Sequence, residues 1–117
     1  MKKLFKVKKE DGADIVGSGS LPVLSTPMLI AYMENVAQLE ATSRCQEHQS
    51  SVGIEINMRH LKASAIGSDI QVEVTMIEQN KSILNYHIKA FDQGQLVAEA
   101  SHKRAIIDVE SFMSKVN

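Results

Sequence analysis

The stretch STPMLIAYMENVAQLEATSR, residues 25–44, decides the fold. Thr26 is a residue type that caps helices, and Pro27 follows at the first helical position, where a missing N–H costs nothing. Together they predict a helix from Pro27 to about Arg44. At about 100° per residue, an apolar stripe runs along one face of this helix. Its members are Ile30, Met33, Ala37 and Ala41. The helix should pack this stripe against another apolar surface.

Downstream of the helix, the spacing of apolar residues changes from a period of 3.6 to a period of 2, which is typical of half-buried strands. Four strands are predicted, separated by turns at 64–68, 78–82 and 92–94. Their apolar alternations span residues 52–60, 70–76, 84–90 and 96–108. In the first strand the inward residues are predicted to be Val52, Ile54, Ile56, Met58 and His60.

The remaining segments are shorter or less regular. Residues 2–9 alternate apolar side chains with lysines and predict a short edge strand. Residues 12–24 hold several Gly and Ser residues and a Pro, so we expect an irregular segment that could cover a site as a lid. Residues 109–117 fit either a short helix or a tail.

A helix that is apolar on one side, next to an antiparallel sheet that is apolar on one face, has one economical arrangement, in which the sheet wraps the helix. This α+β architecture, a long central helix wrapped by a five-stranded antiparallel sheet, is the hotdog fold. The 117 residues suffice for a single domain spanning 1–117. Open sheet edges are usually paired, so we expect a homodimer or a larger assembly such as a tetramer.

Composition excludes several classes of function. Thirteen Lys and Arg residues against fourteen Asp and Glu residues leave a net charge of -1, without the cationic excess that nucleic acid binding needs. The single Cys45 cannot form an intrachain disulfide, which suits a reducing compartment, so we expect a cytoplasmic protein. The basic start is not followed by an apolar run, and no stretch is long enough to span a membrane. We therefore expect neither a nucleic acid nor a membrane partner.

Common cofactor and metal motifs are missing from the chain. It contains no GxGxxG, P-loop, HExxH, GxSxG or CxxC sequence. Its histidines lack the i, i+4 spacing of a helical metal site; they are His48, His60, His87 and His102. We therefore expect no metal and no bound cofactor.

Three residues are candidates for chemistry. Glu34 places a carboxylate in the apolar stripe, where an isolated charge is expensive, so it is either functional or at the margin of a narrow stripe. Glu40 is a weaker candidate of the same kind. His60 faces inward at a strand end and is either functional or a hydrogen-bonded core residue. Thr26 is explained by capping alone. In a helix-wrapped sheet, however, Thr26, Glu34 and His60 could meet.

The last strand carries a second polar pair. His102 and Arg104 extend the apolar face of this strand, and the simplest interpretation is a strand end that reaches solvent. His87 alternates with Asn85 and Lys89 and predicts a solvated outer face.

Several runs together resemble the fluoroacetyl-CoA thioesterase family of hotdog proteins, over about residue 23 to the C-terminus. The first run, VLSTP at 23–27, leads into Met33-Glu34. SVGI at 51–54 then leads to His60, and SHKR at 101–104 follows Gly67. Eight residues separate Thr26 from Glu34, and twenty-six more lead to His60.

The resemblance implies an acyl-CoA thioester hydrolase, with coenzyme A entering as part of the substrate. It implies a catalytic triad of Thr26, Glu34 and His60, and substrate-holding roles for the Gly53 backbone and Arg104. The family's namesake has a phenylalanine-rich lid, whereas residues 17–24 contain no phenylalanine, so we expect a short or small acyl group without committing to a fluorinated one. A non-catalytic acyl-CoA binding module, a hotdog dehydratase or hydratase, and a structural dimerisation domain remain as alternatives.

Overall fold

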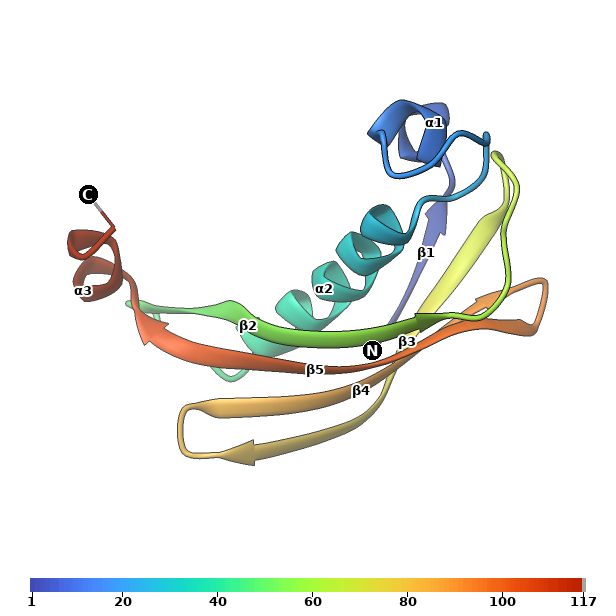
Figure 1. Ribbon diagram of the computed structural model, residues 1–117. Coiled ribbons are helices and arrows are strands. Elements are labelled where there is room, and N and C mark those ends of the chain that lie inside the picture. The colour runs from blue at the N-terminus through green and yellow to red at the C-terminus, as the bar shows by residue number, and fades with distance from the viewer. Residues whose placement is uncertain (117) are drawn as a thin grey trace.

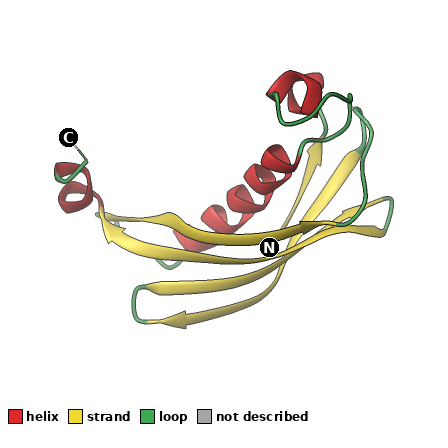
Figure 2. Ribbon diagram, viewed as in Figure 1, coloured by secondary structure: helices red, strands yellow, loops and turns green. Residues whose placement is uncertain are grey.

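Five antiparallel strands curve around one long helix in the computed structural model, which describes residues 1–116 (Figure 1). The long helix is α2 (Thr26–Thr42), and it lies against the concave face of the sheet (Figure 2). The strands are β1 (Lys2–Lys6), β2 (Gln49–His60), β3 (Asp69–Asn80), β4 (Ile83–Asp92) and β5 (Gln95–Asp108). Their order across the sheet is β1-β3-β4-β5-β2, so β1 and β2 form its two edges.

Three short elements complete the chain. The 3-10 turn η1 (Lys9–Asp11) and the single helical turn α1 (Ala13–Val16) occupy the segment before α2, which is otherwise irregular as expected. The C-terminal helix α3 (Val109–Ser114) follows β5 directly, so the helical alternative for this segment is correct as far as Ser114. Asn117, which the prediction for the tail included, lies outside the described residues.

The core lies between α2 and the inner face of the sheet. The helix buries one face, made by Leu29, Tyr32, Met33, Val36, Ala37 and Ala41. The facing strands contribute alternating residues, among them Ile70, Val72, Leu84, Tyr86, Ile88 and Ala98. Burying each large apolar side chain contributes about 1.5–3 kcal/mol, so this layer holds the helix in place. Glu34 lies at the margin of the buried face rather than inside it, with its side chain 42% exposed.

The start of α2 differs from the prediction in one respect that affects the site. The N-cap is Ser25, whose hydroxyl accepts a hydrogen bond from the Met28 N–H at 3.3 Å. Thr26 is the first helical residue, and Pro27 lies beside it in the first turn. The prediction that Thr26 caps the helix is therefore wrong, because the buried Ser25 satisfies the free N–H. As a result, the Thr26 hydroxyl is not used by the helix.

A bulge in β2 changes which residues face the helix. Gly53 pairs with Arg104 and Glu55 pairs with Lys103, so Ile54 is an extra residue in the register. Gly53 therefore shares the inner face with Arg104, whereas Ile54 is 52% exposed. The prediction of Ile54 as an inward residue is wrong for this reason. Beyond the bulge, Ile56 and the residues after it keep the predicted alternation.

Candidate active site

A hydrogen-bonded pair connects the start of α2 to the end of β2. The Thr26 Oγ1 atom lies 2.9 Å from the His60 Nδ1 atom. Thr26 is exposed, whereas the Nε2 atom of His60 is buried and has no hydrogen-bond partner among the described residues. Burial lowers the pKa of His60, which favours the neutral ring. A neutral imidazole can accept the threonine proton at Nδ1, as the base of a hydroxyl nucleophile does.

This pair borders a hollow of about 320 Å³. Segments 23–26 and 60–63 line it, with Ala13 and Ser18 from the segment that precedes α2. The bridge between Val23 and Ala65 ties these walls together. The irregular segment therefore does lie beside the Thr26–His60 pair, as expected for a lid.

A second polar group surrounds the Glu34 carboxylate in the middle of α2. The Oε2 atom of Glu34 lies 3.5 Å from the Arg104 Nη1 atom and 3.8 Å from the His102 Nε2 atom. Gly53 faces the same carboxylate, and a Cβ atom at position 53 would overlap Oε2. The absence of a side chain at Gly53 thus permits the close approach of helix and strand. Glu34, Gly53, His102 and Arg104 are referred to below as the Glu34 group.

Arg104 is buried, contrary to the interpretation of this strand end as solvent-exposed. It is 5% exposed, and its Nε and Nη2 atoms donate to the hydroxyl and the carbonyl oxygen of Ser51 at 2.9 and 3.2 Å. Burial lowers the pKa of Arg104, while the Glu34 carboxylate opposes that shift. The guanidinium therefore directs its donors into the protein, toward Ser51 and Glu34.

His102 is the second residue whose exposure was predicted wrongly, since it is only 4% exposed. Its Nδ1 atom lies 2.8 Å from the Glu55 carbonyl oxygen, which can only accept, so Nδ1 carries the proton. Its Nε2 atom then accepts from the Arg104 Nη1 atom at 3.2 Å. Burial lowers the pKa of His102, in agreement with a neutral ring. His102 thus orients Arg104 beside Glu34.

Glu40 and His87 have plainer surroundings. The Glu40 carboxylate accepts from the Tyr86 hydroxyl at 2.9 Å and from the Arg44 Nε atom at 3.1 Å, which ties the end of α2 to β4. Burial and this carboxylate raise the pKa of Tyr86. His87 lies on the outer face of the sheet, as predicted, and is exposed.

Within one protomer, the three predicted catalytic residues form two separate groups. Thr26 and His60 are in contact, whereas Glu34 lies eight residues along α2, about 12 Å further along the helix axis. On β2, Gly53 and His60 are on the order of 20 Å apart along the strand. The expectation that a single chain brings all three side chains together is therefore not met.

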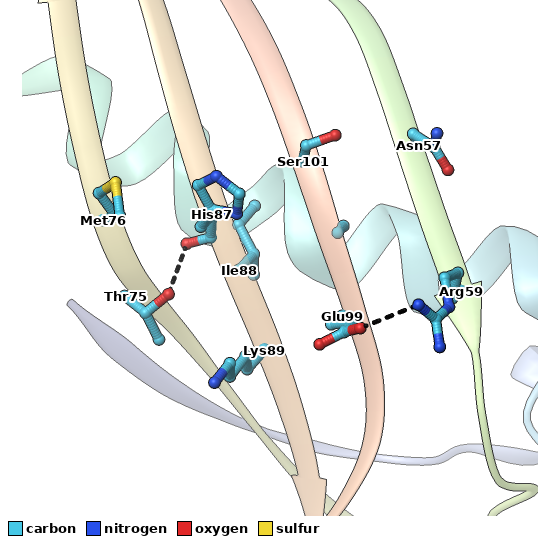
Figure 3. A pocket seen from close by; sticks show the side chains of 10 residues that line it. Asn57, Arg59, Thr75, Met76, His87, Ile88, Lys89, Glu99 and Ser101 are labelled. Atoms are coloured by element: carbon cyan, nitrogen blue, oxygen red, sulfur yellow. Dashed lines mark hydrogen bonds and ion pairs between the residues drawn. The ribbon is translucent and has the colours of Figure 1, made fainter.

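The outer face of the sheet carries another hollow, of about 590 Å³, which Figure 3 shows. Its polar lining includes His87, Lys89 and Ser101, and an ion pair joins Arg59 to Glu99 at 3.4 Å. None of the predicted site residues lines this hollow. The chemistry of interest therefore lies on the helix side of the sheet.

Among residues 1–116, no group of three or more His, Cys, Asp or Glu side chains is arranged to hold a metal ion. None of the helices in this same range is long and apolar enough to cross a membrane.

The architecture is shared with solved structures of the hotdog class. A crystal structure of a variant of the fluoroacetyl-CoA-specific thioesterase FlK, in complex with fluoroacetate and CoA, has a TM-score of 0.91 at 20% identity, covering 99% of this chain and 95% of that one. A Thermus thermophilus thioesterase superfamily member has a TM-score of 0.88 at 18% identity, covering 98% and 88%. A hot-dog-like protein from Thermanaerovibrio acidaminovorans has a TM-score of 0.84 at 20% identity, covering 99% and 86%. The fold is thus the hotdog fold, as predicted.

The sequence then defines the family. Residues 7–110 match the family model of the fluoroacetyl-CoA-specific thioesterase, FlK. The chain therefore belongs to this thioesterase family, a class of hydrolases, which confirms the resemblance found in the sequence. No curated protein matches the chain in sequence.

Sequence reasoning missed how the Glu34 group is held. His102 continues the inward parity of Ala98 and Ala100, and that parity was the available signal for its burial. The inward position of Ser51 could not be predicted in this way. It depends on the bulge in β2, which the alternation of apolar residues does not reveal.

Proposed function

We propose that the protein hydrolyses the thioester of a short or small acyl-CoA, using Thr26, His60 and Glu34. The observation that carries this proposal is the hydrogen bond between Thr26 and the neutral His60 beside the hollow. A hydroxyl paired with an unprotonated imidazole serves acyl transfer, either as a nucleophile or by orienting water. The family relationship supplies the thioester as the substrate class.

In the reaction, the oxygen of water ends on the carbonyl carbon of the acyl group, and the C–S bond breaks. Glu34 accepts a proton from the attacking water as general base and passes it to the neutral His60, which then gives it to the leaving thiolate. The products are a free acid and the thiol of coenzyme A. The Gly53 N–H would stabilise the negative charge that develops on the carbonyl oxygen. No metal or bound cofactor takes part in this proposal.

Because one chain separates Glu34 from the other two residues, we propose that a homodimer completes the site. The free edge of β2 can pair with β2 of a second copy in antiparallel fashion. With the two-fold axis at Asn57, Ile56 faces the partner's Met58, and Glu55 faces the partner's Arg59, an apolar pair and an opposite-charge pair. The bulge at Gly53 then lies beside the partner's His60. Glu34 thereby reaches the Thr26–His60 pair of the other protomer.

Arg104 has a different part in this proposal from the one that the resemblance implied. Since its guanidinium is buried and donates to Ser51, we propose that it helps to hold the substrate indirectly, by positioning Glu34 beside Gly53. Contact with a CoA phosphate would require the side chain to leave these partners.

The proposal predicts that Glu34→Gln abolishes thioester hydrolysis while the fold persists. The substitution keeps the volume and removes the base, so the rate should fall by at least about 10²-fold, the usual contribution of general base catalysis. A thiol-reactive dye measures release of free coenzyme A from a panel of acyl-CoA esters, and short acyl chains should give the highest rates. The matched control is Glu47→Gln, on an exposed carboxylate just after α2.

Three results would contradict the proposal. Binding of acyl-CoA without thiol release would indicate a binding module, and conversion of enoyl or hydroxyacyl chains without thiol release would indicate a dehydratase or hydratase. Retained turnover in Glu34→Gln would remove Glu34 from the reaction.

A further inference from the structure

The C-terminal helix α3 carries an apolar stripe that its own chain leaves uncovered. The stripe follows the i, i+3, i+4, i+7 spacing of one helical face and continues just past the helix; its members are Val109, Phe112, Met113 and Val116. All four are between 36% and 59% exposed, and no residue of α3 is buried. A short helix with a continuous exposed apolar face needs a partner surface to become stable.

The position of α3 is fixed at one end of the free edge. The Asp108 side chain caps the helix by accepting from the Ser111 N–H at 2.9 Å, and the Val109 N–H donates to the His48 carbonyl oxygen at 3.0 Å. The helix thus begins beside the first residues of β2. It rises on the same side of the sheet as α2, at the end opposite to α1 (Figure 1).

A second exposed apolar surface lies at the other end of β2. It is formed by the segment before α2 and by the residue that follows β2; its members are Ile15, Val16, Leu21 and Leu61, each at least 40% exposed. This lid surface flanks the hollow of the Thr26–His60 pair, since Leu61 lines that hollow. The chain therefore has two uncovered apolar surfaces at opposite ends of the edge strand β2.

Antiparallel pairing of two β2 strands brings these two surfaces together. With the two-fold axis at Asn57 and Ile54 as an extra residue, Gln49 at the start of β2 falls beside residue 64 of the partner, next to residue 65 and just past the end of the partner's β2. Those residues are bonded to the lid, through the bridge of Val23 to Ala65 and the Leu24 N–H to the Ser64 carbonyl oxygen at 2.9 Å. Both α3 and the lid stand on the helix side of the sheet, so they meet on the same side.

We infer that α3 of one copy packs on the lid surface of the second copy and forms part of the wall of the hollow beside that copy's Thr26–His60 pair, where the acyl group of the substrate would bind. This inference rests on the homodimer of the proposed function. Phe112 and Met113 would supply large apolar side chains at the acyl end of the substrate. Segment 17–24 has no aromatic residue, and Phe112 of the other copy takes that place. The size of the acyl group accepted is then set in part by the C-terminal helix of the neighbouring chain.

A pair of cysteines tests the contact directly. In a Cys45→Ser background, Leu21→Cys and Phe112→Cys are introduced into the same chain, which is then oxidised and run on a non-reducing gel. A band of twice the monomer mass that disappears on reduction is the expected result. The matched controls are each single cysteine alone, and Leu4→Cys with Phe112→Cys, since Leu4 lies on the opposite edge strand β1. The controls should remain monomeric on the gel.

The dimer is verified separately, so that the two ideas can fail independently. Asn57→Cys in the same background should cross-link to itself across the two-fold axis, while Asn85→Cys on the outer face of β4 should not. A cross-link through Asn57→Cys without one between Leu21→Cys and Phe112→Cys would overturn the α3 inference and leave the dimer standing. A protein that is monomeric by analytical ultracentrifugation would overturn both.

A kinetic measurement tests the role in the pocket. Phe112→Ala with Met113→Ser should raise KM for the preferred acyl-CoA by about tenfold, because apolar contacts with the acyl group are lost. The ratio of kcat/KM between acyl chains of different length should change as well. Val116→Ser, further along the same face, is the control and should change KM less. An unchanged chain-length preference in the double variant would contradict the inference, whereas failure of thiol release in the unmodified protein would contradict only the hydrolase assignment.

Discussion

The Thr26–His60 pair and the Glu34 group hold their polar side chains in opposite ways. The pair has one hydrogen bond and an exposed hydroxyl, so a substrate can reach it without displacing protein atoms. In the Glu34 group, Arg104 and His102 are almost fully buried and bonded to one another and to Ser51 or Glu55. One group is open for reaction, and the other is a rigid support that presents a single carboxylate.

This difference shows how a small fold can separate reactivity from positioning. A buried arginine that also donates to Ser51 and His102 fixes a carboxylate more firmly than an exposed one would, because moving it would leave polar groups unpaired. The exposed threonine costs nothing to the fold, since Ser25 already caps the helix. Substitutions in the two groups should therefore differ in their effects on rate and on stability.

The largest effect is expected from His60→Gln. Loss of the imidazole removes the base of the Thr26 hydroxyl, and kcat/KM for acyl-CoA hydrolysis should fall by roughly 10²–10⁴-fold. The midpoint of thermal unfolding should change little, because His60 is only half-buried. Steady-state kinetics and calorimetry measure the two quantities. A large loss of stability with a proportionate loss of rate would show that His60 acts as a core residue.

A smaller effect is expected from Gly53→Ala. The new Cβ atom would overlap the Glu34 carboxylate and displace it, and a misplaced catalytic group commonly costs on the order of 10²-fold in rate. If the loss acts through Glu34, then Glu34→Gln combined with Gly53→Ala should be no slower than Glu34→Gln alone. Additive losses in this double-mutant cycle would instead mean that Gly53 acts independently of the carboxylate.

The smallest effect concerns the dependence of stability on pH. Burial lowers the pKa of both His60 and His102 in the folded state, whereas the unfolded histidines titrate near their usual value of about 6.5. Below about pH 6.5 the unfolded chain then binds more protons than the folded chain, so the free energy of unfolding falls as the pH falls. The stabilisation is fully present above that pH. Each histidine contributes a slope of at most about 1.4 kcal/mol per pH unit.

Substitution of His102 shows how much of this slope comes from the Glu34 group. Urea unfolding at a series of pH values measures this slope. Below about pH 6.5, His102→Gln should make the free energy of unfolding depend less on pH, since glutamine does not titrate. His87→Gln, on the exposed outer face, should leave the dependence unchanged. A slope that is identical in the unmodified protein and in His102→Gln would mean that folding does not lower the pKa of His102.

Much of the fold could be predicted from the sequence, because it depends on local periodicity. The helix after Ser25 and the four long strands follow from the change in period from 3.6 to 2, and their packing into a hotdog fold follows from the two apolar faces. The candidate residues Glu34 and His60 were found because each places a polar group on an apolar face.

What could not be predicted depends on contacts between distant segments. Arg104 is buried because it contacts Ser51 of β2 and Glu34 of α2. The apolar pattern of β5 alone does not predict these contacts. Ser25 and Thr26 are adjacent residues of similar capping ability, and sequence patterns do not place a helix start to within one residue. Glu34 is separated from Thr26 by the rise of the helix, about 1.5 Å per residue. A helical wheel shows only the angular position of each residue and therefore hides this distance.

The extra residue in β2 has one more consequence. Since side chains alternate along a strand, a regular strand from Ser51 to His60 could present either Gly53 or His60 to the helix, but not both, because their numbers differ by seven. The insertion of Ile54 joins two half-strands of opposite phase, so one continuous backbone presents both an odd-numbered and an even-numbered candidate residue to the same interior. If Ile54 instead paired in register and the strand were regular, one of the two residues would turn toward solvent.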